Sequence, residues 1–244
     1  MHRTVIPPHA VQDDMILIDD PQTVHHLVRV LRVKPGDQLE CLDGQGHVYR
    51  GTITCCARSQ LTVAIERQSK EPPARLQITL AQALIKPQRF EWVIEKATEL
   101  GVVRVIPMVT SRTTIRFGSG REAHRVERWR RIAESAAAQC GRATLPAIQA
   151  PQLFRRVLEQ LSGRYALLPT LAEESESLAR ALRGLEDATE AVILVGPEGD
   201  FSPAEVALAK RQGAHTTSLG RLTLRSETAA IATLTILQHT AEVL

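Results

Sequence analysis

The 244-residue sequence has few aromatic residues, few cysteines and no long apolar run. With two tryptophans, two tyrosines and four phenylalanines, extensive stacking of nucleic-acid bases on aromatic side chains is not expected. The four cysteines form no C-x-x-C pair, so the sequence predicts neither a disulfide framework nor a metal site. No stretch of about 18 apolar residues could span a membrane, and the first residues lack the layout of a signal peptide. We therefore expect a cytoplasmic protein without a membrane anchor.

Two nucleotide-binding signatures are also absent. The sequence contains neither the phosphate loop G-x-x-x-x-G-K-[ST] nor the dinucleotide turn G-x-G-x-x-G. A P-loop kinase is therefore disfavoured. A dinucleotide-dependent metabolic enzyme is disfavoured too, because it would need that turn followed by a ribose-binding acid.

Arginines are concentrated in one segment, although the formal net charge of the whole chain is only +3. Between residues 112 and 131 the acidic residues are Glu122 and Glu127, and the arginines are Arg112, Arg116, Arg121, Arg125, Arg128, Arg130 and Arg131. Such a cationic stripe is typical of a surface that binds phosphates.

The first 70 residues have the pattern of a small β-rich domain. Apolar residues alternate with polar ones around Leu39, Tyr49 and Leu61, and glycine-containing turns separate these runs. This spacing predicts a small β-barrel or meander. Ahead of it, the apolar positions of residues 24–31 predict a short helix that places Arg29 and Arg32 on its other face.

After the polar segment at residues 69–73 the pattern changes to alternating strands and helices. Residues 76–85, 102–108, 165–168, 191–195 and 216–219 read as strands, and residues 90–100, 122–139 and 154–161 as helices. The run at 191–195 is continuously aliphatic, as in a buried parallel strand. We therefore expect domains at 1–70 and 74–244, the second of them α/β.

Two glycine-containing loops follow predicted strands and are candidate ligand loops. In the first, Gly196 and Gly199 follow the buried strand, and Ser202 with Glu205 forms a capping box for the next helix. In the second, Gly220 follows a strand, and Ser226 is a candidate cap for an apolar helix. Each loop could also be a plain turn.

The polar residues beside Ser226 have structural as well as functional interpretations. Glu227 could simply complement the helix dipole, and Arg225 could simply pair with Glu227. At the end of the long helix, Gln139 and Arg142 could contact RNA or substrate, or could only cap the helix. Cys140 is a poor nucleophile candidate, because a helix C-terminus does not lower a thiol pKa.

Five motifs in series resemble the RsmE family of 16S ribosomal RNA uridine-N3 methyltransferases, in the SPOUT superfamily. They are HHLVRVLRVKPGD with the Asp43-Gly44 turn that follows it, KPQRFEWVIEKATELGV, QCGR, LVGPEGDFSPAE and SLGRLTLRSETAA. The resemblance covers nearly the whole chain. It implies a PUA-like barrel that helps to hold RNA, followed by an α/β domain with a deep trefoil knot, and a homodimer.

The resemblance also implies that S-adenosylmethionine lies in a pocket built from the two glycine loops. The residues that it assigns to the cofactor are Leu168, Pro169, Leu194, Val195, Gly196, Glu198, Gly199, Leu219, Gly220, Leu222, Leu224, Arg225 and Thr228. The segment Ala136-Ala137-Ala138, just before QCGR, departs from the more polar pattern expected there, which leaves details of RNA contact open.

Methylation at uridine N3 requires that nitrogen to lose its proton and to face the methyl group, so much of the catalysis is positioning. Arg225 is a candidate for stabilising charge on a uracil carbonyl, and Glu227 is the nearest candidate proton acceptor. The candidate RNA contacts are Arg3, Arg29, Arg32, Arg112, Gln139 and Arg142. Two alternatives remain: another RNA target such as transfer RNA, or a noncatalytic RNA-binding ribosome-assembly factor.

Overall fold

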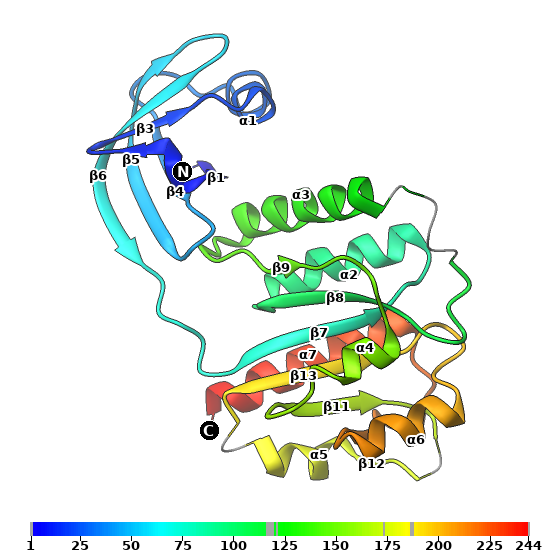
Figure 1. Ribbon diagram of the computed structural model, residues 1–244. Helices are drawn as coiled ribbons and strands as arrows, with labels where there is room; N and C mark the ends of the chain where they lie inside the picture. The colour runs from blue at the N-terminus through cyan, green and yellow to red at the C-terminus, as the bar shows by residue number, and fades with distance from the viewer. Residues whose placement is uncertain (1, 116–119, 121, 173, 186–187, 244) are drawn as a thin grey trace. The chain divides into compact units, whose positions relative to one another are not determined.

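The computed structural model describes all residues except 1, 116–119, 121, 173, 186–187 and 244 (Figure 1). The chain divides into two compact units. Unit 1 comprises Met1–Pro73 and Glu134–Leu145, and unit 2 comprises Ala74–Ala133 and Pro146–Leu244. The sequence predicted two domains that are each continuous in the chain, with a boundary near residue 70. In the structure, unit 1 also includes the twelve residues Glu134–Leu145.

Unit 1 contains a mixed sheet with the strand order β1-β4-β5-β6-β3-β2. Its strands are β1 (His2–Val5), β2 (Val11–Gln12), β3 (Met15–Ile18), β4 (Gln38–Leu42), β5 (His47–Cys56) and β6 (Leu61–Lys70). The pairing of β1 with β4 is parallel and the other pairings are antiparallel. Leu39, Ile53 and Leu61 are buried on one face, so the period-two pattern correctly identified the core of this unit.

The register of β5 against β6 shifts between Arg50 and Gly51, as in a β-bulge. Gly51 lies so close to β6 that a Cβ atom added to it would be 2.0 Å from the Ala64 carbonyl oxygen. Only glycine can occupy this position while the two strands keep their distance.

The predicted helix at residues 24–31 is irregular. A short α1 (Pro21–His25), capped by the Asp20 carboxylate, runs directly into a π-helical segment, His26–Val30. Val24 and Leu27 are buried while Arg29 and Arg32 are exposed, which confirms the predicted faces. Arg32, two residues after the segment, has a left-handed φ of 56°. A short 3-10 turn, Pro8–Ala10, also belongs to this unit.

Unit 2 contains a parallel sheet with the strand order β10-β8-β7-β13-β11-β14-β12, and β9 pairs with β8. The strands are β7 (Gln77–Ala83), β8 (Arg104–Val109), β9 (Ala147–Ile148), β10 (Gln152–Leu153), β11 (Tyr165–Pro169), β12 (Glu176–Ser177), β13 (Glu190–Val195) and β14 (His215–Ser218). The aliphatic strand β13 lies between β7 and β11, and this confirms the predicted buried parallel strand (Figure 1).

Helices cover both faces of this sheet. They are α2 (Pro87–Glu99), the first part of α3 (Glu122–Cys140), α4 (Phe154–Leu158), α5 (Leu178–Ala181), the 3-10 turn Leu182–Leu185, α6 (Pro203–Arg211) and α7 (Ser226–Val243). Ile193 of β13 belongs to the apolar cluster with α2, α3, α5 and α7, whereas Val192 and Leu194 belong to the cluster with α4 and α6. Alternate residues of one strand thus serve two cores, as expected of an α/β sheet covered on both sides.

Helix α3 ends at Cys140, one residue beyond the predicted end, and Gly141 follows with a φ of +83°. This left-handed glycine confirms the predicted C-terminal cap. The last residues of α3 belong to unit 1, where the Arg3 guanidinium donates to the Gln139 carbonyl (3.2 Å). Arg3 also binds Glu40, a buried carboxylate that Arg50 contacts from the other side (2.6 Å each).

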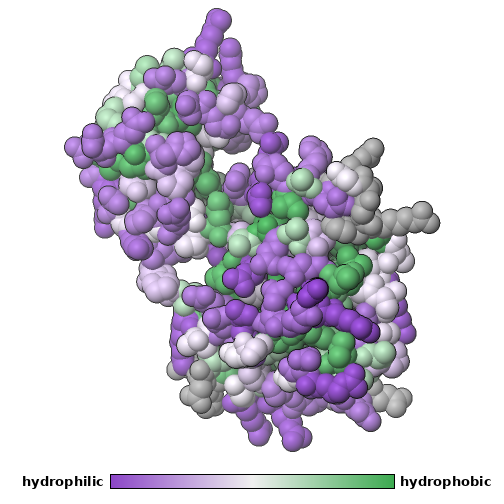
Figure 2. Space-filling model, viewed as in Figure 1, coloured by the Kyte–Doolittle hydropathy of each residue, from purple (hydrophilic) through white to green (hydrophobic). Residues whose placement is uncertain are grey.

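Figure 2 shows a mostly hydrophilic surface with small hydrophobic areas. Within the described residues, no helix combines the length and apolar character needed to cross a membrane. The same residues contain no group of three histidine, cysteine, aspartate or glutamate side chains able to hold a metal ion.

Candidate functional site

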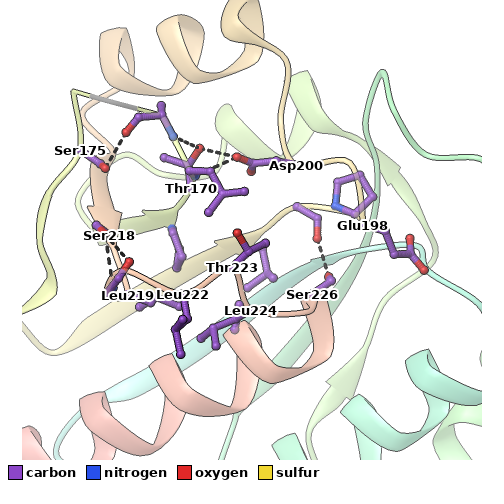
Figure 3. A pocket seen from close by; sticks show the side chains of 18 of the residues that line it. Thr170, Ser175, Glu198, Asp200, Ser218, Leu219, Leu222, Thr223, Leu224 and Ser226 are labelled. Atoms are coloured by element: carbon purple, nitrogen blue, oxygen red, sulfur yellow. Dashed lines mark hydrogen bonds between the residues drawn. The ribbon is translucent and has the colours of Figure 1, made fainter.

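A cavity of about 410 Å³ opens at the carboxyl ends of three neighbouring strands of unit 2 (Figure 3). Pro169 ends β11, Val195 ends β13 and Ser218 ends β14, and all three residues line the cavity. Ligands of parallel α/β sheets characteristically bind outside the carboxyl ends of the strands, and small-molecule sites commonly have volumes of about 300–1,000 Å³. Position and size both indicate a small-molecule pocket.

The first pocket wall is the loop after β13, residues 196–201. Asp200 adopts a left-handed conformation (φ 60°), which aspartate tolerates better than most residues. Its carboxylate accepts hydrogen bonds from the Thr170 hydroxyl (2.8 Å) and the Leu171 N–H (2.9 Å), which belong to the loop after β11. Asp200 therefore joins two loops of the pocket, as the dashed lines in Figure 3 show.

The second wall is the loop after β14, residues 219–225. Within the described part of the chain, the backbone groups of Arg221, Leu222 and Thr223 make no hydrogen bond, so their donors and acceptors are free for a ligand. Leu222 is 80% exposed, and Leu171, on the loop after β11, is 62% exposed. Large exposed aliphatic side chains lining a cavity suit an apolar ligand surface.

Ser226 connects the two walls and does not act as the predicted helix cap. It is the first residue of α7, and its hydroxyl donates to the Gly196 carbonyl oxygen (Figure 3). The same hydroxyl accepts a hydrogen bond from Gln82 Nε2 (2.9 Å), at the end of β7. The sequence pattern pointed to a local cap, whereas the actual partners lie 30 and 144 residues away.

The predicted capping box at the start of α6 is confirmed: the Ser202 hydroxyl accepts from the Glu205 N–H, and the Glu205 carboxylate accepts from the Ser202 N–H. Glu205 also accepts from the N–H and the hydroxyl of Ser111 (2.8 Å each). Burial alone would raise the pKa of Glu205, but the hydrogen bonds from Ser202 and Ser111 outweigh burial and hold its pKa below the ordinary value.

We expect Glu205→Gln to reduce the free energy of unfolding by about 1–2 kcal/mol at pH 7, because an ionised acceptor is lost that binds four donors, the N–H and hydroxyl groups of Ser111 and Ser202. A carboxyl group whose pKa is lower in the folded state stabilises the fold at pH values above its unfolded pKa, about 4.3. This contribution disappears as the pH falls through the folded-state pKa. The difference between the two proteins should therefore shrink in acid. Urea unfolding at pH 7 and pH 3 measures it, with exposed Glu159→Gln as control; a difference that grows in acid contradicts the assignment.

Arg89, in the first turn of α2, faces one carboxylate from the first wall and one from the first turn of α7. Its guanidinium lies 3.8 Å from Glu198 Oε1 and 3.5 Å from Glu227 Oε1. Glu227 thus pairs with Arg89; the alternative pairing with Arg225 is absent from the ion pairs of the described residues. Glu227 stands in the first turn of α7, where a carboxylate complements the helix dipole, and its buried Oε2 has no partner among the described residues.

Most of the residues assigned to the cofactor gather at this cavity. Those lining it are Pro169, Val195, Gly196, Glu198, Leu219, Gly220, Leu222 and Leu224. Leu168 and Leu194 lie instead in the apolar core, one residue before the strand ends. Gly199, Arg225 and Thr228 are exposed and do not line the cavity, although each is a sequence neighbour of a lining residue.

Several lining residues are not among those that the resemblance assigned to the cofactor. They are Thr170, Leu171, Ala172, Ser175, Pro197, Asp200, Ser218, Arg221, Thr223, Ser226 and Ala229. The segment at 170–175 follows a predicted strand but contains no glycine loop, so only the position of β11 beside β13 could have indicated it.

The predicted RNA contacts fall in both units. Arg29 and Arg32 are exposed in unit 1, as is Gln139. Burial lowers the pKa of Arg142, while the charge of Glu71 opposes that shift. Arg142 Nε donates to the Thr144 hydroxyl. Arg112 in unit 2 donates to the Gly199 carbonyl (2.6 Å), so it supports the pocket loop.

Much of the arginine stripe is paired with carboxylates. Arg128 forms two hydrogen bonds to Glu91, and Arg130 and Arg131 each lie within 4 Å of Glu127. Arg125 is partly exposed. Two further members of the predicted stripe, Arg116 and Arg121, lie outside the described residues.

Two family matches cover most of the chain. Residues 72–238 match the family described as the RNA methyltransferase domain, and residues 18–66 match the RNA methyltransferase PUA domain. The second match agrees with the predicted PUA-like character of the N-terminal domain.

Similar proteins carry one name. Ribosomal RNA small subunit methyltransferase E of Synechocystis sp. is 34% identical over 232 residues, which are 93% of this chain and 74% of that protein. The Mycobacterium tuberculosis protein of the same name is 32% identical, over 88% of this chain and 83% of that protein. The Bacillus subtilis protein of that name is 27% identical, over 91% and 90%.

Solved structures resemble the whole chain. A Legionella pneumophila protein in complex with the cofactor SAM has a TM-score of 0.88 at 29% identity, covering 97% of this chain and 96% of that one. Ribosomal RNA small subunit methyltransferase E from Neisseria gonorrhoeae, bound to S-adenosyl methionine, has a TM-score of 0.87 at 27% identity, covering 98% and 97%.

Proposed function

This chain belongs to the RNA methyltransferase family, and from that premise we propose that it transfers a methyl group from S-adenosylmethionine to small-subunit ribosomal RNA. The observation that carries the proposal is the pocket. It is built from two of the segments that carry the family resemblance and from the loop after β11, at the edge of a parallel sheet where ligands bind. The target that the resemblance implies is N3 of a uridine in 16S ribosomal RNA.

The residues of the pocket fit this cofactor. Leu219, Leu222 and Leu224 offer an apolar wall for a flat base, and the free backbone groups of residues 221–223 suit its polar edges. Glu198 places a partly exposed carboxylate beside the cavity, and this charge suits a ligand with ammonium and sulfonium groups. When bound, S-adenosylmethionine supplies the electrophilic methyl group.

The remaining catalysis is assigned to residues beside the pocket. Arg225 is exposed between the lining residues Leu224 and Ser226, where its guanidinium can reach a carbonyl of an incoming uracil. Glu227 is the proposed acceptor of the N3 proton, and Arg89 holds its carboxylate in the first turn of α7. Because the Watson–Crick edge of a paired uridine is blocked, the target must be unpaired or turned out.

Further elements of the proposal come from the resemblance. Arg3, Arg29, Arg32, Gln139 and Arg142 in unit 1, and Arg112 in unit 2, are the proposed RNA contacts. The proposal also includes a trefoil knot in the α/β domain, a homodimer, and a cytoplasmic location beside the ribosome. Phosphate contacts of this kind would make RNA binding weaken as salt rises.

The test measures transfer of labelled methyl from S-adenosylmethionine to three substrates: unmodified small ribosomal subunits, free ribosomal RNA and transfer RNA. Nucleoside analysis then identifies the modified base. We expect label in 3-methyluridine of the small subunit, and a strong loss with Arg225→Ala, with exposed Arg183→Ala as a matched control.

Four other outcomes would each count against part of this proposal. Label in transfer RNA would keep the enzyme class and replace the substrate. Label in another nucleoside of ribosomal RNA would remove the uridine-N3 target. The absence of cofactor binding and transfer would favour an RNA-binding assembly factor. Full turnover by Glu227→Gln would remove Glu227 as proton acceptor.

A further inference from the structure

Gln82 is a buried polar residue at a position where the strand pattern calls for an apolar one. It follows Ile78 and Leu80 at intervals of two on β7, and both of these belong to the core cluster covered by α2 and α7. Gln82 itself is 0% exposed and pairs in register with Val195 of β13. A buried amide in such a place requires a reason beyond packing.

The hydrogen bonds around Gln82 can point in only one direction. The Ser226 hydroxyl has a single proton, which it donates to the Gly196 carbonyl oxygen, so it must accept from Gln82 Nε2. Nε2 also donates to the Ala83 carbonyl (3.1 Å). These two bonds fix the amide orientation and leave Oε1 buried with no donor among the described residues.

We propose that Gln82 is a positioning residue for the cofactor pocket, acting through the Ser226 hydroxyl on the Gly196 carbonyl. Gln82 and Ser226 are buried, whereas Gly196 lines the cavity, so the chain of bonds runs from the core to the ligand wall. It joins the end of β7, the start of α7 and the loop after β13. This inference rests on the proposed function, because its readout is cofactor affinity.

The hydrogen-bond geometry favours this role over a purely structural one. A buried donor-acceptor pair stabilises little, and replacing both partners by apolar groups of similar shape can be nearly neutral. Among the described residues Gln82 Oε1 has no donor, and a buried oxygen without a donor costs free energy, so stability alone gives no reason for an amide here. Orienting one carbonyl of the pocket needs the hydrogen bonds and not the volume of the side chain.

The experiment is a double-mutant cycle read by S-adenosylmethionine affinity in calorimetry, with melting temperature measured on every variant. The variants are Gln82→Met, which keeps the volume and removes the amide, Ser226→Ala, and the two combined. Thr233→Val is the matched control, since it removes another buried α7 hydroxyl whose hydrogen bond, to the Ala229 carbonyl, stays within the helix.

We expect each single variant to raise the cofactor Kd about tenfold, which corresponds to about 1.4 kcal/mol. The double variant should show the same tenfold effect, because Gln82 acts through Ser226. Gln82→Met should not lower the melting temperature, the double variant should melt no lower than Ser226→Ala, and Thr233→Val should bind normally. The KM for RNA should not change.

Several results would overturn the inference. The first is an unchanged Kd in Gln82→Met, and the second is a Kd raised about a hundredfold in the double variant, as for two independent effects. The third is a double variant that regains both the affinity and the melting temperature lost in a single variant. If the unsubstituted protein bound no cofactor, the proposed function itself would be wrong. If both the unsubstituted protein and Gln82→Met bound the cofactor normally, only this inference would be wrong.

Discussion

Gly51→Ala should destabilise unit 1 by about 4–5 kcal/mol, near the upper limit for a single substitution. The added methyl group would lie 2.0 Å from the Ala64 carbonyl oxygen and 2.9 Å from its carbon, far inside van der Waals contact. Relief requires β5 to separate from β6, and these neighbouring strands carry much of the unit's sheet pairing. The backbone atoms of Ala64 cannot move aside as a flexible side chain could.

Denaturant unfolding should therefore show a transition at much lower urea for Gly51→Ala. Cofactor binding should survive, because every residue that lines the pocket belongs to unit 2, while transfer to RNA should be lost with the unit that holds most proposed RNA contacts. Thr54→Ala, an exposed change on the same strand, serves as control. An unfolding midpoint equal to the parent's would show that β5 and β6 can accommodate a side chain here.

Gly196→Val should weaken S-adenosylmethionine binding about a hundredfold. Even a single Cβ atom at Gly196 would lie 3.2 Å from the Phe201 ring and 3.3 Å from the Asp200 backbone carbon. Phe201 is buried against Phe154, with ring centroids 5.3 Å apart, so it cannot retreat. Overpacking of this kind costs about 1–3 kcal/mol, and a branched side chain beside the ligand wall should reach the upper part of that range.

Calorimetric titration measures this loss, with Gly196→Ala expected to be intermediate. Ala207→Val, on the exposed side of α6, adds apolar bulk away from the cavity and should bind normally. If Gly196→Val bound the cofactor as tightly as the parent, then the 196–201 loop would not be a wall of the binding site.

Patterns of neighbouring residues predicted the parts of this protein that depend on local order. The aliphatic run of β13, the capping box of Ser202 and Glu205 and the left-handed Gly141 follow from periodicity and backbone preference. The two glycine loops were recognisable because strand ends and helix starts leave the same signature in many α/β proteins.

Contacts between distant segments could not be predicted in this way. The Asp200 carboxylate binds Thr170 and Leu171 across 30 residues, and Arg89 faces Glu198 and Glu227 from another helix. The strand order that brings these segments together is set by tertiary packing, which single-residue preferences do not encode. The π-helical turn at His26–Val30 was missed for a related reason, since its apolar spacing also suits an ordinary helix.

Because unit 1 is formed from two separate stretches of the chain, it cannot fold completely early in synthesis. A nascent chain emerges N-terminus first, and domains tend to fold as soon as their residues are available. Unit 1 cannot be complete until Glu134–Leu145 have been made, after β7, α2 and β8. Strand β7 meanwhile keeps one edge without a partner until β13 is added from residue 190 onward. The translating ribosome therefore carries a half-built sheet with an open edge, which is the stage at which chaperone protection would matter most.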